Sequence, residues 1–172
     1  TAGGATTATT AAPGATSVPT TTLAEDDSDS SIPWIPIAIA IAAGGRALGR
    51  VDVEAGDVLY LALEDTGRRL QSRLSAVLGD DPAPARLHLA TECAALTDGG
   101  APRIGDWLDQ HPDARLVIVD VFTKIRGTTD GNEGRYESDY RAMSALKDLA
   151  DEAGVAFLVV HHTRKAVSED YI

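Results

Sequence analysis

The sequence predicts an α/β fold built on an open, mostly parallel β-sheet with helices on both faces. Three apolar runs, at residues 58–63, 116–119 and 155–160, each end directly in carboxylates or histidines. The runs are continuously apolar rather than alternating, which is typical of strands that are buried on both faces. Ligands of such sheets bind at the edge formed by the carboxyl ends of the strands. The polar residues that follow the runs are therefore the first candidates for a functional site.

The first structured segment is ambiguous from its pattern. Residues 37–43 alternate isoleucine with alanine, and both the period of two and the β-branching favour a strand. The alanine content and the stop at Gly44 and Gly45 favour a short buried helix instead. Periodicity alone leaves both possibilities open.

From residue 58 onward, strand and helix signals alternate. Strands are expected near residues 58–63, 86–89, 116–120 and 155–160, and helices near residues 67–78, 103–110 and 137–153. Thr66 is a candidate N-cap for the first of these helices. The last helix is indicated by the i, i+4 and i+7 spacings of Tyr136, Tyr140, Met143, Leu146 and Ala150. Repeated strand–helix units imply right-handed crossovers and a parallel sheet.

The N-terminal residues differ in composition from the rest of the chain. Thr, Ala, Gly and Pro dominate up to residue 22, and an acidic, serine-rich run follows at residues 25–31. Such a stretch has too little apolar surface to offset the entropy lost on ordering. We therefore expect a disordered tail over residues 1–31 and a folded unit over residues 32–172.

Composition excludes several classes of protein. The chain has 172 residues, enough for one α/β domain with a core, and a net charge of −11, which argues against a uniformly basic nucleic-acid-binding surface. Cys93 is the only cysteine, so neither an intrachain disulfide nor a cysteine metal cluster can form. No apolar run approaches the ~20 residues that span a bilayer, and the N-terminus lacks the basic flank of a secretory signal. We expect a cytoplasmic protein without a membrane partner.

Two carboxylates stand at strand ends where a phosphate-handling site would need them. Asp120 is placed to hold Mg²⁺ through water, because this ion prefers oxygen ligands and keeps much of its hydration; an aspartate that caps the next turn is the alternative. Glu64 can polarise a water for attack on a phosphate, or it is a solvated acid at the end of a strand. Asp65 would favour the start of the following helix electrostatically.

Histidines and cations follow the third apolar run. His161 and His162 are adjacent, so on a strand they point to opposite faces and can bind one metal ion only if the strand breaks there. A histidine that hydrogen-bonds a phosphate or the attacking water suits this position better. Arg164 and Lys165 can neutralise phosphate charge in this chain or in a neighbouring subunit, although a solvated basic turn would have the same sequence.

Three segments, in this order, carry a family resemblance: VLYLALEDTGRRLQSRL from residue 58, ARLVIVDVF from residue 114 and LVVHHTRK from residue 158. Together they resemble the RecA-type AAA ATPases related to the plasmid hexameric helicase RepA, over roughly residues 37–168. The resemblance implies a RecA-like P-loop NTPase core that binds ATP and Mg²⁺. It also implies that residues 37–48 form the helix that follows the phosphate loop.

The resemblance assigns roles to individual residues. It implies that Glu64 is the catalytic glutamate, that Asp120 is the Walker B aspartate that holds Mg²⁺ through water, and that His162 is the sensor. It further implies a homo-oligomeric, hexameric ring in DNA replication, with hydrolysis between subunits and single-stranded DNA as a candidate partner. Arg164 and Lys165 match the basic pair that reaches the nucleotide of an adjacent subunit in that family. His161, from its position after the third apolar run, is a further candidate for nucleotide binding.

The family's phosphate loop is missing from its expected place. Gly-x-x-x-x-Gly-Lys-Ser/Thr should precede the first helix, so that backbone N–H groups and a lysine surround the phosphates. Residues 29–36 instead read Asp-Ser-Ser-Ile-Pro-Trp-Ile-Pro, and no lysine precedes Lys124. We therefore expect a fragment of the domain, truncated at both ends, whose first 36 or so residues are foreign to the family. Such a chain would bind ATP poorly or not at all.

Three functional hypotheses follow. The leading one is an ATPase domain of a RepA-like, DNA-associated protein, impaired in this chain and inactive alone. The second is a non-catalytic subunit that assembles with an intact ATPase and lends it Arg164 and Lys165. The third is an unrelated metal-dependent α/β hydrolase that uses Asp120 and the histidines.

Overall fold

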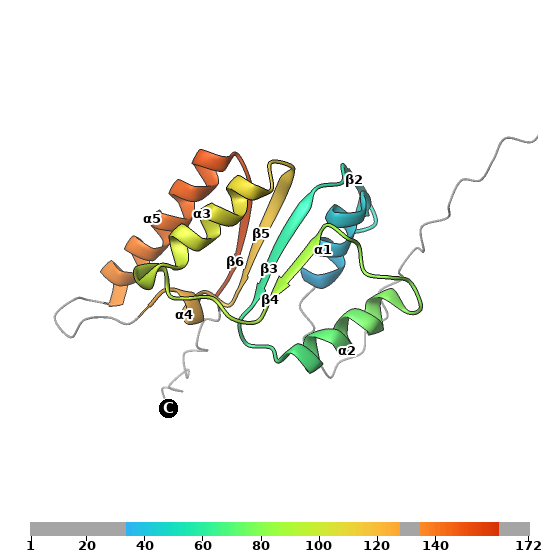
Figure 1. Cartoon of the computed structure of the whole chain (residues 1–172), viewed down its shortest axis with the longest axis horizontal. Coiled ribbons are helices and arrows are strands. Elements are labelled where there is room, and N and C mark those ends of the chain that lie inside the picture. The colour runs from blue at the N-terminus through green and yellow to red at the C-terminus, as the bar shows by residue number, and fades with distance from the viewer. Residues whose placement is uncertain (1–33, 128–134, 162–172) are drawn as a thin grey trace, which may run out of the picture.

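The computed structural model describes residues 34–127 and 135–161. Four parallel strands form the main sheet in the order β4-β3-β5-β6 (Figure 1). The α/β fold class with a mostly parallel sheet is thereby confirmed, and each strand lies within two residues of its predicted position. The predicted tail over residues 1–31 lies outside the described residues. The strands are β3 (Asp57–Ala62), β4 (Leu87–Ala90), β5 (Ala114–Asp120) and β6 (Ala156–Val160).

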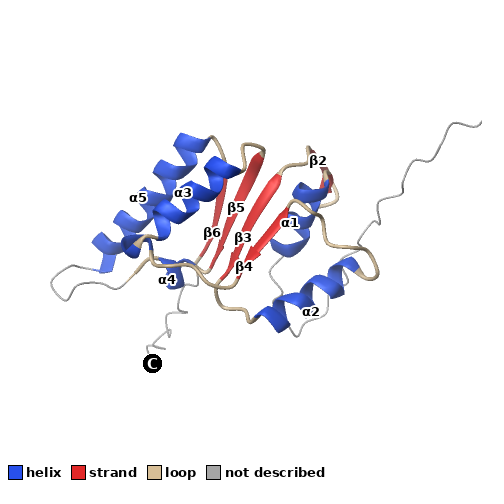
Figure 2. Ribbon diagram, in the orientation of Figure 1, coloured by secondary structure: helices blue, strands red, loops and turns tan. Residues whose placement is uncertain are grey.

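Helices cover both faces of this sheet (Figure 2). On one face, α1 (Trp34–Ala43) and α2 (Gly67–Leu78) pack against the strands. On the other face lie α3 (Gly100–Gln110) and α5 (Arg135–Ala153). Two short helical elements lie next to these: the 3-10 turn η1 (Leu96–Asp98) before α3, and α4 (Phe122–Ile125) after β5.

Alternate residues of the central strands enter two separate cores. The core shared with α3 and α5 takes Leu59, Leu61, Val117 and Val119. The core shared with α1 and α2 takes Val58, Tyr60, Leu116 and Ile118. Because both faces of β3 and β5 are buried, their sequences have to be continuously apolar, as the predicted strands were.

The ambiguous segment at residues 37–43 belongs to a helix, but with different bounds from those the family resemblance implied. The helix α1 begins at Trp34 and ends at Ala43, where Gly44 takes a left-handed φ of 71°. The residues that follow form an antiparallel hairpin of β1 (Gly45–Ala47) and β2 (Val51–Val53) instead of more helix. The expected continuation of the helix to residue 48 is therefore wrong, because glycine at the end of α1 releases the chain into a turn.

The expected helix near residues 67–78 is confirmed together with its cap. The Arg69 backbone N–H donates to the Thr66 side-chain oxygen at 3.3 Å. This bond satisfies one of the N–H groups that the first turn leaves without a helical partner. Leu70 is the buried anchor of α2 against the sheet.

In α5, three of the five residues that marked the helix in the sequence do not face the core. Tyr136, Tyr140 and Met143 are 83%, 67% and 43% exposed. Leu146 is buried as expected, and Ser138 and Ala142, at i and i+4 on the same side of the helix, are buried with it. Small side chains at 138 and 142 let α5 lie close to its neighbours, so the helix turns its tyrosines outward.

None of the helices in the described ranges is both long enough and apolar enough to cross a membrane. The most apolar of them, α1, has only 10 residues, about half the length that a span requires.

A first prediction concerns Gly56, which is buried directly before β3. A Cβ at this position would lie 2.1 Å from Cγ of Arg115 and 2.7 Å from the carbonyl oxygen of Asp113. We expect Gly56→Ala to lower the free energy of unfolding by about 1–3 kcal/mol, because backbone has to move to admit the methyl group. Urea denaturation measures the change.

The matched control is Gly67→Ala at the start of α2, where a Cβ would meet nothing within 4 Å. This change should leave the stability equal to or slightly above that of the wild type. Equal stability of the two variants would contradict the close approach of the chain at Gly56.

Candidate functional site

The carboxyl ends of β3, β5 and β6 form one edge of the sheet. Ala62 lies opposite Asp120, and Asp120 lies opposite Val160. The pairing of β3 with β5 extends one residue further, because the Leu63 N–H donates to the Asp120 carbonyl oxygen at 2.6 Å. The structure thus brings Glu64, Asp120 and His161 to the same edge, as the three apolar runs predicted.

Asp120 is buried at this edge and is held by a tyrosine. Its side chain shares the α1 face of the sheet with Tyr60, which lies two residues earlier on the neighbouring strand. The Tyr60 hydroxyl donates to Oδ2 of Asp120 at 2.8 Å. Burial, and secondly this hydrogen bond, raise the pKa of Tyr60, so the phenol stays a donor at neutral pH. One carboxylate oxygen of Asp120 is fixed, and the carboxylate is of the ligand type that Mg²⁺ prefers.

A second polar cluster supports the turn between β3 and α2. The Asp65 side chain is only 6% exposed and forms ion pairs with Arg73 and with Arg69, the latter at 3.3 Å. The charges of Arg73 and Asp65 lie close enough to Tyr60 to act on the pKa of its hydroxyl, which Arg73 lowers and Asp65 raises. Asp65 therefore does more than favour the start of α2: it ties the turn that carries Glu64 to the body of that helix.

Sequence reasoning missed Tyr60, Asp65 and Arg73 as parts of the site. A polar signal was present in each case. Tyr60 is the only hydroxyl group in the apolar run of β3, and Asp65 stands four residues before Arg69 and eight before Arg73. Such spacing on a helix places the two arginines one and two turns from the acid.

The other predicted site residues are more peripheral or lie outside the described part. Glu64 is exposed in the turn after β3. His161 is exposed after β6, with its ring 5.8 Å from that of Phe122. The remaining predicted residues, which fall in the range 162–172 outside the described part, are His162, Arg164 and Lys165. Within residues 34–127 and 135–161, no three His, Cys, Asp or Glu side chains gather to hold a metal ion.

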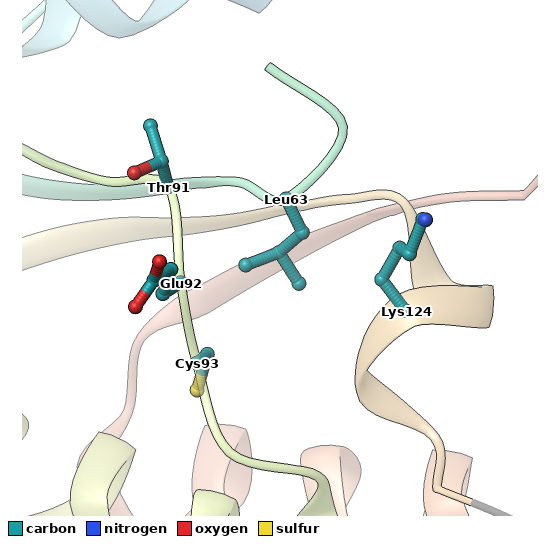
Figure 3. A pocket seen from close by; sticks show the side chains of 5 residues that line it. All are labelled: Leu63, Thr91, Glu92, Cys93 and Lys124. Atoms are coloured by element: carbon teal, nitrogen blue, oxygen red, sulfur yellow. The ribbon is translucent and has the colours of Figure 1, made fainter. Parts of the chain in front are cut away.

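An open pocket of about 370 Å³ lies near the same edge of the sheet. Figure 3 shows the Leu63 side chain pointing into the space between the segment at residues 91–93 and Lys124. Leu63 and Cys93 pack against the α3–α5 core, so the pocket opens on the face opposite to Tyr60 and Asp120. Burial raises the pKa of the Cys93 thiol, which disfavours the reactive thiolate.

The start of α1 does not fit a triphosphate. A phosphate site at a helix N-terminus needs free N–H groups and, in the family that the sequence resembles, a lysine. Here the helix begins with the bulky Trp34, whose indole nitrogen is buried without a partner among the described residues, and Pro36 has no N–H. The preceding residues 26–33 contain neither lysine nor glycine. The residues present thus suit Mg²⁺ at Asp120 but not the phosphates of ATP.

Comparison with known protein families identifies a match. A family model described as an AAA domain matches residues 34–168. The match begins at Trp34, the first residue of α1, and includes β3, β5 and β6 with their strand-end residues. No curated protein matches the chain.

Removal of the Tyr60 hydroxyl tests the support of Asp120. We expect Tyr60→Phe to lower the free energy of unfolding at neutral pH by about 1–3 kcal/mol, because a buried carboxylate oxygen loses its donor. Urea denaturation measures the loss. Tyr140→Phe removes a hydroxyl from an exposed ring and controls for the substitution.

The difference in stability between the wild type and Tyr60→Phe should depend on pH. Folding raises the pKa of Tyr60, so its stabilisation is complete below the ordinary tyrosine pKa of about 10 and is lost as the pH rises above it. The stability of the wild type should therefore fall more steeply than that of Tyr60→Phe in alkaline solution. If the free energies of unfolding of the wild type and Tyr60→Phe fall in parallel from neutral to strongly alkaline pH, the assigned hydrogen bond is contradicted.

The Asp65 ion pairs give a further prediction. Asp65→Asn should lower the free energy of unfolding by about 1–3 kcal/mol, because it leaves the half-buried Arg73 guanidinium without its carboxylate. Asp52→Asn is the matched control, since Asp52 pairs with Arg46 at 3.0 Å but is 83% exposed. Its loss should be small, because water screens exposed pairs. Equal losses in thermal melts of the two variants would show that Asp65 does not anchor the turn.

Proposed function

The chain belongs to the AAA domain family, and we propose that it is an ATPase-type domain of the RepA-like, DNA-associated kind whose own nucleotide site is incomplete. The observation that carries the proposal is the edge shared by β3 and β5. There the buried Asp120 is the last residue of β5, and Glu64 lies in the turn after β3. Tyr60 supports the first and Asp65 the turn that carries the second. The order and spacing of the three motifs support the RepA-like assignment.

Two roles rest on residues that the structure describes. Asp120 would hold Mg²⁺ through water, with its orientation fixed by Tyr60. Glu64 would polarise the attacking water from the turn that Asp65 anchors. Both roles need groups at the carboxyl edge of the sheet, where this geometry supports them.

Other roles rest on the family resemblance alone. His162 would sense the γ-phosphate, next to His161, and the basic pair Arg164 and Lys165 would reach the nucleotide of an adjacent subunit in a ring. Single-stranded DNA remains the proposed polymer. The net charge of −11 means that its binding would depend on a local basic segment rather than on the whole surface.

We propose that nucleotide binding is impaired, because no phosphate loop precedes α1 in the sequence. Asp26, Asp27 and Asp29 lie in or just before the segment where the family has its phosphate loop, and acids repel a polyphosphate. Without the cradle, Asp120 acts on the ligand only through Mg²⁺, and Glu64 acts only on a phosphate that is already held in line. Both carboxylates are present, yet neither compensates phosphate charge.

A non-catalytic role beside an intact relative is the second candidate, and the missing cradle favours it. Such a subunit would lend Arg164 and Lys165 in trans without binding ATP itself. A mixture with an intact relative should then turn over ATP faster than the relative alone. Charge reversal at Arg164 and Lys165 should abolish the stimulation, and the unrelated metal-dependent hydrolase would give no stimulation at all.

Nucleotide binding tests the main proposal. We expect no binding of Mg²⁺–ATP to the unmodified chain by calorimetry at ~millimolar nucleotide, because the N–H cradle and its lysine supply most of the charge compensation. Replacing residues 26–33 by Gly-x-x-x-x-Gly-Lys-Ser, together with Pro36→Ala, should restore measurable binding. Tight binding by the unmodified chain would overturn the account.

The repaired protein then separates binding from chemistry. Glu64→Gln in that background should keep ATP binding and lose turnover, because it removes the base and keeps the shape. Asp120→Asn should weaken the dependence on Mg²⁺ as well. Glu54→Gln, a change in an exposed carboxylate before β3, is the matched control and should affect neither. Turnover that survives Glu64→Gln would remove the catalytic role from Glu64.

A further inference from the structure

The open pocket at the carboxyl edge is built from the ends of three adjacent strands (Figure 3). Leu63 follows β3, the segment at residues 91–93 follows β4, and Lys124 lies on α4 after β5. Ligands of open α/β sheets bind where the carboxyl ends of adjacent strands meet. The pocket opens on the face opposite to Tyr60 and Asp120, so the supported carboxylate does not occupy it.

The floor of the pocket is apolar and fixed. Leu63 packs against the α3–α5 core, and its N–H donates to the Asp120 carbonyl oxygen at 2.6 Å. Cys93 packs against the same core, and burial raises the pKa of its thiol, so the thiol stays neutral at neutral pH. A fixed apolar floor favours a ligand with a hydrocarbon part.

The rim of the pocket carries one acid and one base. Figure 3 shows the Leu63 side chain between the segment that holds Glu92 and the side chain of Lys124. Both charged residues are exposed, and neither forms a hydrogen bond or an ion pair within the part of the chain that the structure describes. Lys124 is held beside the pocket because its neighbours on α4, Phe122 and Ile125, are buried in the core.

The remaining polar groups near the pocket leave both charges available. Arg103 of α3 acts electrostatically on the Cys93 thiol but does not line the pocket. Thr91 lines it and adds a hydroxyl, which can donate and accept hydrogen bonds. The space is thus bordered by a carboxylate, an ammonium and a hydroxyl around an apolar floor.

Volume and charge together select a class of ligand. The pocket measures about 370 Å³, near the lower end of the ~300–1,000 Å³ typical of small-molecule sites. A purely anionic ligand would be attracted by Lys124 but repelled by Glu92, and a purely cationic one would meet the reverse. A small molecule that carries one positive and one negative group forms a charge-assisted hydrogen bond with each.

We propose that this pocket binds a small amino-acid zwitterion with an apolar hydrocarbon part. The ligand's ammonium would donate to the Glu92 carboxylate, and Lys124 would donate to the ligand's carboxylate. Its hydrocarbon part would pack on Leu63 and Cys93, and Thr91 would bond either polar end.

This site is separate from the nucleotide site. None of the residues that line it is Glu64, Asp120 or one of their supports. Loss of amino-acid binding would therefore leave the nucleotide proposal untouched, and failure of ATP binding would leave the amino-acid site untouched.

Cys93 reports on occupancy, because it is the only cysteine of the chain and lines the pocket. The probes are leucine and its isomer 6-aminohexanoate, which has the same atoms but a wider separation of the two charges. We expect one of them at about 10 millimolar to slow the alkylation of the full chain by iodoacetamide at least threefold, since an open pocket gives roughly millimolar affinity. Intact mass measures the rate, and calorimetry measures binding independently.

Neutral variants assign the two ends of the ligand. Glu92→Gln and Lys124→Gln should each weaken protection by the effective isomer roughly tenfold. Glu92→Gln should not alter the weaker effect of the N-acetylated isomer, which has no ammonium. Each variant is compared with its own rate without ligand, because a nearby charge changes thiol reactivity. Lys147→Gln, at an exposed residue of α5, is the matched control and should behave like the wild type.

Three outcomes would overturn the proposal. The first is neither protection nor heat of binding with either isomer up to about 100 millimolar. The second is equal protection by the N-acetylated and the free amino acid, which would make the pocket a site for carboxylates such as a peptide C-terminus. The third is protection that survives both neutral variants, which would place the ligand away from the two charges.

Discussion

The register between β3, β5 and β6 determines where every candidate site residue lies. Ala62, Asp120 and Val160 stand in one row across the sheet, so the residues that follow the strands emerge side by side. A slip of one residue would turn Asp120 away from Tyr60 to the opposite face. Two cores resist that slip, because each strand buries alternate side chains against different helices. The packing that makes the domain stable is therefore also what positions its carboxylates.

The strands and the shared edge could be predicted because they depend on local pattern. Continuous apolar runs that end in Glu64, Asp120 and His161 are typical of buried parallel strands. The supports could not be predicted, since a tyrosine within a buried run does not reveal which neighbouring strand will present a partner to it. The sequence pattern also could not predict which side of α5 faces the core. The small side chains of Ser138 and Ala142 fit closely against the core, while the larger tyrosines do not. The β1–β2 hairpin was not predicted, because the family resemblance implied a helix that continues past Gly44 to residue 48.

The polar network at the edge has a structural role that is independent of any ligand. Tyr60 satisfies a buried oxygen of Asp120, and Arg73 compensates the charge of Asp65. Removing either acid would leave its partner buried and unpaired, which is costly whether or not nucleotide binds. A domain without a phosphate loop would thus keep these residues for folding alone. Their presence is therefore evidence of the architecture of the domain and not, by itself, of catalysis.

The hydrogen bond between Tyr60 and Asp120 also says when the site comes into being during folding. It joins residues 60 positions apart, and α2, β4 and α3 all lie in the intervening chain. Closing so long a loop is entropically unfavourable and is not repaid until β5 docks beside β3. The part of the chain up to β4 contains Glu64 but no aspartate opposite it. The two carboxylates can therefore face each other only after β5 has been added to the sheet, whatever the order in which the helices form.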